Sequence, residues 1–355
     1  MDQPLIYGVE FQARSLCSQH AEVDQVSFLI GTQSLNTQNN QVHLVKLQEN
    51  SNTLTSQVYE HNCGEIWSLS ASTINKQLIS TCYADTEKDC ERYSTLWRLP
   101  EEDGQLEKVI SFPTEKYGMD IKVTSFHPTN ESYMASVVDN NVLFWDVDEN
   151  GVKLVSNVIL DGKGQPRFTT GKWNPQSVNL QFVTSDDCNI KAWDLRCQAK
   201  IAWSLDGAHN QIIRDFDFNQ NRQFYLATCG DDGYSKFWDI RNTNKPIITR
   251  SDHSHWIWSI RYNPVHDELV GTASSDGQVL ITRLFGISSA ALENEEDSIK
   301  TSLDDKVIAV CDQHEDSVYC VEWSAANSWI LASLSYDGRL LLNKVPKDEQ
   351  LKILL

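Results

Sequence analysis

The sequence predicts an all-β fold, in the form of a seven-bladed β-propeller with four-stranded antiparallel blades. Three observations lead to this fold class. A Trp–Asp motif recurs along the chain, short runs alternate apolar and polar residues between turn residues, and helical periodicity is almost absent. Together they predict that residues 1–355 build one propeller.

The recurring motif is clearest in three copies, "ASVVDNNVLFWDV" (135–147), "TSDDCNIKAWDL" (184–195) and "TCGDDGYSKFWDI" (228–240). Four weaker copies complete the series. The position of the tryptophan then falls, in chain order, at Val45, Trp97, Trp145, Trp193, Trp238, Thr282 and Asn343. Successive positions are 44 to 61 residues apart. This spacing is near the roughly 40–45 residues of a WD40 repeat, so seven WD40-type blades are expected.

Each repeat contains β-type runs at regular places. In the fifth, "IRDFDFN" and "YLATC" precede an Asp–Gly turn and the tryptophan run follows it, while runs such as "AKIAWSL" supply a fourth, outer strand. Residues 286–306 break the period with six acids against two lysines, and we expect an acidic, flexible insertion between blades six and seven. Ring closure stays open, because either "QPLIYG" (3–8) or "QLKILL" (350–355) can provide the outer strand of blade seven.

The fifth repeat suggests why an Asp–Gly turn precedes the Trp–Asp pair. We predict one buried hydrogen-bonded chain formed by His209, Thr228, Asp232 and Trp238. Satisfying buried polar groups in this way fixes the turn and stiffens the blade. Partial sets recur in other repeats, so we interpret the set as architecture and not as a catalytic triad. Trp97 follows no Asp–Gly turn, and we expect packing to be the main interaction that holds it.

Composition and charge exclude several classes of function. A net charge of −19 argues against binding to nucleic acid or anionic lipid. No run reaches the length of a membrane-spanning helix, and the first residues lack the basic and apolar regions of a signal peptide, so we expect none. The nine cysteines form no C-x-x-C pair, and we expect reduced thiols in a cytoplasmic protein. No residues have the spacing of a catalytic, cofactor or metal site, so no enzyme and no cofactor are predicted.

One rim of the propeller is a candidate docking face for a protein partner. The first strand of each blade lines the central channel, so the residues at its start lie on one rim. Counting back from the core aromatic residue of each such run places five large aromatic residues there, in neighbouring blades: Tyr7, Trp67, Trp256, Trp258 and Tyr319. Exposed aromatic residues reduce solubility unless a partner covers them, and interface energy concentrates in such anchors.

Several segments go beyond the general repeat pattern, and they resemble the family of EARP- and GARP-complex-interacting proteins. They are "YGVEFQARSL" (7–16), "LIGTQSL" (29–35), "GEIW" (64–67), "HSHWIWSIRYN" (253–263), "HEDSVYCVEWS" (314–324), "SLSYDGRLLLNKVP" (333–346) and "ILL" (353–355). The resemblance implies a non-enzymatic WD-repeat adaptor of the endosome-associated recycling and Golgi-associated retrograde tethering complexes. It also implies roles in endosomal recycling, retrograde transport to the trans-Golgi network and dense-core-vesicle cargo sorting. The protein would then lie at the trans-Golgi network and endosomes, held to membranes only through its partners.

A second function of another class follows from two short motifs. "WDLR" (193–196) and "WDIR" (238–241) end consecutive repeats, and they resemble the box found in substrate receptors of cullin–RING ubiquitin ligases. In that alternative Arg196 and Arg241 would face a large adaptor propeller. Arginine can also follow such a motif simply because it pairs with a neighbouring carboxylate.

Overall fold

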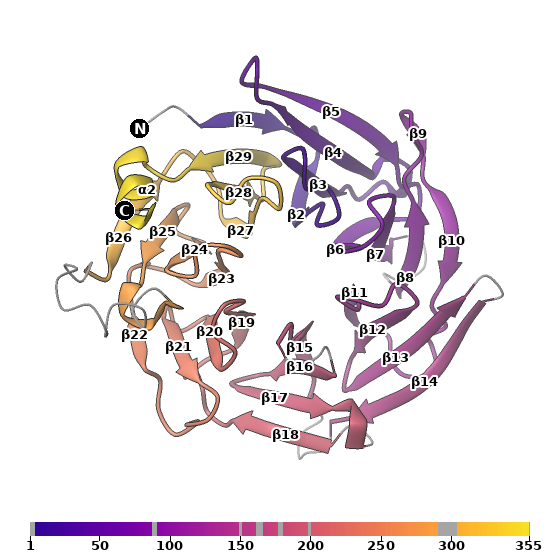
Figure 1. The fold of residues 1–355 in the computed structure, drawn as a ribbon. Coiled ribbons are helices and arrows are strands. Elements are labelled where there is room, and N and C mark those ends of the chain that lie inside the picture. The colour runs from indigo at the N-terminus through magenta and orange to yellow at the C-terminus, as the bar shows by residue number, and fades with distance from the viewer. Residues whose placement is uncertain are drawn as a thin grey trace.

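The computed structural model describes residues 4–86, 91–148, 151–160, 166–176, 180–197, 200–289 and 304–354. Its strands form seven sheets, arranged as the blades of a ring around a central channel (Figure 1). Successive strands within a blade pair antiparallel. The predicted fold class, a seven-bladed propeller with four-stranded blades, is confirmed.

In every blade the strands follow one another from the channel outward. Blade one contains β2 (Gln12–Ser18), β3 (Ser27–Gln33), β4 (Gln41–Gln48) and β5 (Thr53–Glu60), and blade two contains β6 (Glu65–Ala71), β7 (Leu78–Asp85), β8 (Glu91–Arg98) and β10 (Glu107–Ser111). Blade three contains β11 (Ile121–Phe126), β12 (Tyr133–Val138), β13 (Asn141–Asp148) and β14 (Gly151–Ile159). Blade four contains β15 (Phe168–Trp173), β16 (Gln181–Asp186), β17 (Asn189–Asp194) and β18 (Lys200–Leu205).

Blade five contains β19 (Ile213–Phe218), β20 (Tyr225–Gly230), β21 (Ser235–Asp239) and β22 (Ile248–Arg250). Blade six contains β23 (Ile257–Tyr262), β24 (Leu269–Ser274), β25 (Val279–Arg283) and β26 (Lys306–Cys311), and blade seven contains β27 (Val318–Trp323), β28 (Ile330–Ser335), β29 (Arg339–Lys344) and β1 (Leu5–Gly8). A two-residue strand, β9 (Gly104–Gln105), adds to β5 in parallel. The helix α2 (Lys347–Leu354) follows the last blade.

The first strand of the chain closes the ring. β1 pairs antiparallel with β29, from Leu5 opposite Leu342 to Gly8 opposite Arg339. Figure 1 shows the two ends of the chain on the same side of the ring as a result. Of the two ways of closure that the sequence left open, the N-terminal one is therefore correct, and the C-terminal segment forms α2 instead.

The core lies between the blades. At the predicted tryptophan positions the third strand faces an apolar residue of the second strand, as where Trp145 faces Met134 and Trp238 faces Leu226. Neighbouring blades cover both faces of these inner strands, so every residue of β24 and of β28 is buried. Such strands are apolar nearly throughout and not only on alternate residues.

The acidic insertion falls in a different place from the one expected. The strands that flank residues 286–306 are β25 and β26, and both belong to blade six. The segment therefore joins the third and fourth strands of blade six and does not connect blade six to blade seven. Residues 290–303 lie outside the described part of the chain, so the flexibility of the segment stays a prediction.

Candidate docking site at the channel mouth

A β-bulge occurs at the same point of the innermost strand in all seven blades. In each blade the register between the first and second strands shifts, so that one residue of the first strand has no direct partner. The residues at these bulges, called the bulge ring below, are Arg14, Trp67, Lys122, Thr169, Arg214, Trp258 and Tyr319. All seven line the central cavity of about 720 Å³. A bulge bends its strand and changes the direction of the side chain, so the fold itself builds this ring.

The bulge ring corrects one residue of the predicted docking rim. Tyr7 lies in β1, the outer strand of blade seven, and its hydroxyl contacts Nδ1 of His43 at 2.9 Å. It therefore does not lie on the rim, and Arg14 of β2 occupies that place in blade one. The sequence pattern concealed Arg14, because Ser18 and not an aromatic residue follows it at the core position.

Arginines and aromatic rings alternate along one side of the channel mouth, in the order Arg92, Trp67, Arg14, Trp258 and Arg214, of which Arg92 lies in β8 and the others belong to the bulge ring. The Arg14 guanidinium lies 5.1 Å from the Trp67 ring centroid, 5.4 Å from that of Trp258 and 4.1 Å from that of Tyr319. The two end arginines each lie 4.5 Å from their tryptophan. Contacts of this kind are attractive by about 0.5–2 kcal/mol each, so Arg14 is held in place by aromatic faces.

Four of the five predicted rim aromatics are in this region. Trp256 packs edge-on against Trp258 at 6.2 Å between ring centroids, and Trp258 packs against Tyr319 at 4.7 Å. Trp67 joins them through Arg14. The side chain of Trp256 is 43% exposed, whereas the other three are half-buried. The result is a continuous aromatic surface that spans blades two, one, seven and six.

The other cations at the channel mouth, including Arg92 of β8, are neutralised by carboxylates. Lys122 and Arg92 both pair with Asp120, at 2.6 and 2.5 Å, and Arg214 forms a two-pronged pair with Asp231 at 2.6 and 2.7 Å. No carboxylate of the described residues lies within ion-pair distance of Arg14.

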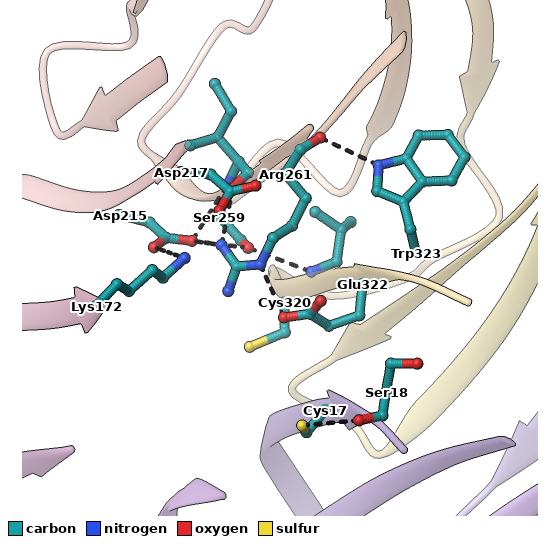
Figure 2. Close-up of polar contacts among 12 residues, drawn as sticks. Cys17, Ser18, Lys172, Asp215, Asp217, Ser259, Arg261, Cys320, Glu322 and Trp323 are labelled. Atoms are coloured by element: carbon teal, nitrogen blue, oxygen red, sulfur yellow. Dashed lines mark hydrogen bonds and ion pairs between the residues drawn. The ribbon is translucent and has the colours of Figure 1, made fainter. Parts of the chain in front are cut away.

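Further along the channel lies a compact group of buried charges (Figure 2). Asp215 pairs with Lys172 at 2.9 Å and with Arg261, and it accepts a hydrogen bond from the Ser259 hydroxyl at 3.1 Å. The other side of Arg261 donates to Glu322 at 2.8 Å. Burial opposes ionisation of Asp215, but the two cations hold the pKa of its carboxyl below the usual value. The charges of this group satisfy one another across blades four to seven.

The fifth blade brings together the four residues of the expected hydrogen-bonded chain. Trp238 donates its indole N–H to the Thr228 hydroxyl at 3.0 Å, and that hydroxyl contacts Nε2 of His209 at 2.7 Å. Nδ1 of His209 contacts the Asp232 carboxylate at 2.8 Å. Burial lowers the pKa of His209, and the bond to Asp232 partly opposes that shift. Gly233 follows at φ +73°, so the tight turn favours glycine there.

Three other blades form related chains: blades six and seven, where the sequence shows partial sets, and blade two, where the sequence motif does not mark one. In blade two, Trp97 donates to the Thr81 hydroxyl at 2.8 Å, and that hydroxyl contacts His61 at 3.0 Å. The sequence did not predict this hydrogen bond, and the expectation that packing is the main interaction of Trp97 stays a prediction. The signal was present in the spacing, because each of these histidines precedes its hydroxyl partner by 19 or 20 residues.

Blade seven builds its chain without a tryptophan. The Asn343 side-chain amide donates to the Ser333 hydroxyl at 3.1 Å and so takes the place of the indole N–H. His314 contacts Ser333 at 2.8 Å and, through its other ring nitrogen, Ser335 at 2.8 Å. Ser335 in turn donates to the turn carboxylate of Asp337. Different side chains thus produce the same connection between turn and third strand.

The arginines of the two WD-x-Arg motifs occupy equivalent places at the ends of β17 and β21. Arg196 binds both carboxylate oxygens of Asp194 at 3.0 and 2.6 Å, and Arg241 binds those of Asp239 at 2.9 and 2.6 Å. Both side chains are more than half exposed, at 62% and 57%. Each aspartate of the motif therefore already fixes its own arginine, in the arrangement expected of a local ion pair.

Within the described residues, no cluster of three or more His, Cys, Asp or Glu side chains is placed to hold a metal ion. The described helices include none with the length and apolar character needed to cross a membrane.

The chain is similar to known proteins along its whole length. The family described as EIPR1 beta-propeller matches residues 1–281, and the WD domain, G-beta repeat family matches residues 305–342. A Gekko japonicus protein named EARP-interacting protein homolog is 41% identical and aligns over 100% of this chain and 99% of its own. The Homo sapiens protein named EARP and GARP complex-interacting protein 1 is 39% identical with the same coverage.

Among solved structures, the WD40 propeller domain of Doa1 aligns with a TM-score of 0.68 over 98% of this chain and 97% of its own. Its sequence identity is 16%, so this likeness concerns the fold alone. The family match covers most of the chain, and the full-length relatives bear the same family's name. The chain therefore belongs to the EIPR1 beta-propeller family.

Proposed function

We propose that this propeller is a non-enzymatic adaptor that binds the EARP and GARP vesicle-tethering complexes. The observation that carries the proposal is its similarity, from end to end, to relatives whose names state that interaction. The chain's net charge of −19 fits a protein partner better than nucleic acid, because nucleic acid selects clustered cations.

In this role the protein supports endosomal recycling, retrograde transport to the trans-Golgi network and the sorting of dense-core-vesicle cargo. It is cytoplasmic, and it is peripheral at the trans-Golgi network and endosomes. Its contact with membranes then depends on the tethering complexes, since the chain's acidic charge does not favour anionic lipid.

We place the docking site on the aromatic surface of the channel mouth, formed by Trp67, Trp256, Trp258 and Tyr319 together with Arg14. Tryptophan, tyrosine and arginine are the residue types that dominate interface energy. Cation–π contacts fix Arg14 and the rings around it, so little side-chain freedom remains to be lost on binding. Trp256 is the most exposed of the group and has the most surface for a partner to cover.

The test is co-purification of the tethering complexes with a double variant, Trp256→Ala and Trp258→Ala. Removing two anchors of about 2 kcal/mol or more each reduces binding at least several-hundred-fold, so the complexes are lost from the pull-down. A thermal melt on the same protein should show a modest shift, because these side chains lie outside the blade cores. Retention of the complexes by this folded variant would move the docking site elsewhere.

The matched control is the double variant Arg196→Ala and Arg241→Ala. Both arginines are exposed and bind their own aspartates, so tether binding should stay within about twofold. The same variant tests the ligase-receptor alternative, because loss of a co-purifying ubiquitin-ligase adaptor from it would support that function. Loss of the tethers with the arginine pair, but not with the tryptophan pair, would place docking near the WD-x-Arg motifs.

A further inference from the structure

Arg14 differs from the other cations that line the central cavity. Lys122, Lys172, Arg214 and Arg261 each have a carboxylate within 3 Å. For the Arg14 guanidinium, the described residues provide neither an ion pair nor a hydrogen-bond acceptor, and only aromatic rings surround it. Its five N–H donors are thus available to a ligand.

The contacts of Arg14 restrain its position and leave its donors available. Three rings approach the guanidinium, so much of its apolar surface is covered by aromatic contact. The N–H groups point outward in the guanidinium plane, and stacking does not use them. A planar fork of N–H groups matches the two oxygens of a carboxylate, and such paired, charge-assisted bonds are among the stronger polar contacts.

The cavity next to Arg14 has room for a peptide segment. Its volume of about 720 Å³ lies in the range of pockets that hold ligands of several side chains. The lining includes five cations, Arg14, Lys122, Lys172, Arg214 and Arg261, against three carboxylates, Asp215, Asp217 and Glu322. Asp120 and Asp231 lie outside this lining and pair with Lys122 and Arg214, so the charge left to attract an acidic group is that of Arg14.

We propose that Arg14 is the receptor for a carboxylate side chain, Asp or Glu, carried on an extended segment of the partner protein. The carboxylate pairs with the guanidinium fork, and an apolar residue beside it in the segment packs on Trp256. This inference rests on the proposed function, because it states what chemistry the docking site recognises. The segment enters the mouth of the channel and not the buried charge group, whose cations are already paired.

The experiment compares the affinity of the purified tethering complex for the wild-type propeller and for two variants, Arg14→Met and Arg14→Lys. Loss of a two-pronged charged bond weakens binding about 10- to 100-fold, and this is expected of Arg14→Met. Arg14→Lys should lose at least about fivefold, because an ammonium group keeps the charge but not the fork. Salt should weaken wild-type binding more steeply than binding by Arg14→Met.

Arg92→Met is the matched control. It also removes one positive charge and one contact to Trp67, but Arg92 is already paired with Asp120. Its affinity should stay within about threefold of wild type. Equal losses in Arg92→Met and Arg14→Met would show that general charge, and not a carboxylate fork at Arg14, accounts for the effect and would overturn the inference.

Two other outcomes separate the inference from the proposed function. If the tryptophan pair abolishes binding and Arg14→Met leaves it within threefold, the docking face is correct and the carboxylate receptor is wrong. If the wild-type propeller itself fails to bind the complex, the proposed function is wrong. A phosphatase-treated complex should bind unchanged, and loss of binding after that treatment would show that a phosphate group occupies the site, again overturning the inference.

Discussion

Two arginines in the same channel differ in what surrounds their charge. Arg261 lies among buried residues, where Asp215 and Glu322 take up its guanidinium from two sides. Arg14 lies at the mouth, against three aromatic rings and without a carboxylate among the described residues. The guanidinium of Arg261 is paired within the fold, whereas the N–H donors of Arg14 have no acceptor among the described residues. This difference is the reason for proposing Arg14, and not Arg261, as a docking residue.

The largest expected effect comes from removing Arg261, whose charge is fully paired inside the channel. Arg261→Met leaves Glu322 without its cation and Asp215 with Lys172 alone, and it should lower the free energy of unfolding by about 3–5 kcal/mol. Arg14→Met removes only partly exposed ring contacts and should cost about 1 kcal/mol. Chemical denaturation of both variants measures the difference. Similar losses at the two sites would mean that Arg14 also has a structural role, and its assignment to docking would weaken.

A smaller loss of stability is expected from breaking the hydrogen-bonded chains inside the blades, and it compares a chain that ends in a carboxylate with one that does not. Trp238→Phe removes the indole N–H that binds the Thr228 hydroxyl, in a chain that Asp232 completes. The free energy of unfolding should fall by about 1–2 kcal/mol. Trp97→Phe breaks an equivalent bond to Thr81, but among the described residues no aspartate completes that chain, so the loss should be nearer 1 kcal/mol. Equilibrium unfolding of the two variants measures these losses. A larger loss at Trp97 would show that the carboxylate adds nothing to the network.

The smallest effect concerns pH. Burial lowers the pKa of His61 to about 4, whereas it is about 6.5 in an unfolded chain. The folded state therefore binds fewer protons than the unfolded state between these values, and stability falls as pH drops below about 6.5. His61→Gln should reduce the loss of unfolding free energy between pH 7.5 and 5.5 by about 1 kcal/mol.

His209 is the control for that measurement. Burial lowers its pKa as well, but the hydrogen bond and charge of Asp232 oppose the shift. His209→Gln should therefore remove less of the pH dependence than His61→Gln does. The opposite order would indicate that Asp232 does not stabilise the protonated ring.

Local pattern was enough to predict the blades, but it was not enough to order the strands at the ring closure. The run around Tyr7 has the alternation of a first strand, and only its pairing with β29, at the far end of the chain, shows that it is an outer one. Arg14 was missed for the same reason. Its strand, β2, has Ser18 where five other blades carry an aromatic residue, so alignment on aromatic residues did not detect it.

The hydrogen-bonded chains show a second limit of sequence motifs. A motif names residue types, but the fold requires only a donor, a hydroxyl and a ring nitrogen in the right places. Asn343 supplies that donor as an amide, and His61 contacts Thr81 without an Asp–Gly turn. By contrast, six positions of the bulge ring could be predicted from their fixed distance to the core position of the strand, which is aromatic in five blades and Ala71 in blade two.

The closure by β1 also sets an order of events during synthesis. A ribosome adds about 5–20 residues per second, so roughly 20–70 s separate the appearance of β1 from that of its partner β29. For that whole interval β1 is a strand edge that a neighbouring nascent chain could capture. The strand is only four residues long, and short edge strands form few hydrogen bonds with a wrong partner. A strand that is synthesised before the other strands described is thus among the last to pair, and its short length limits wrong pairing until then.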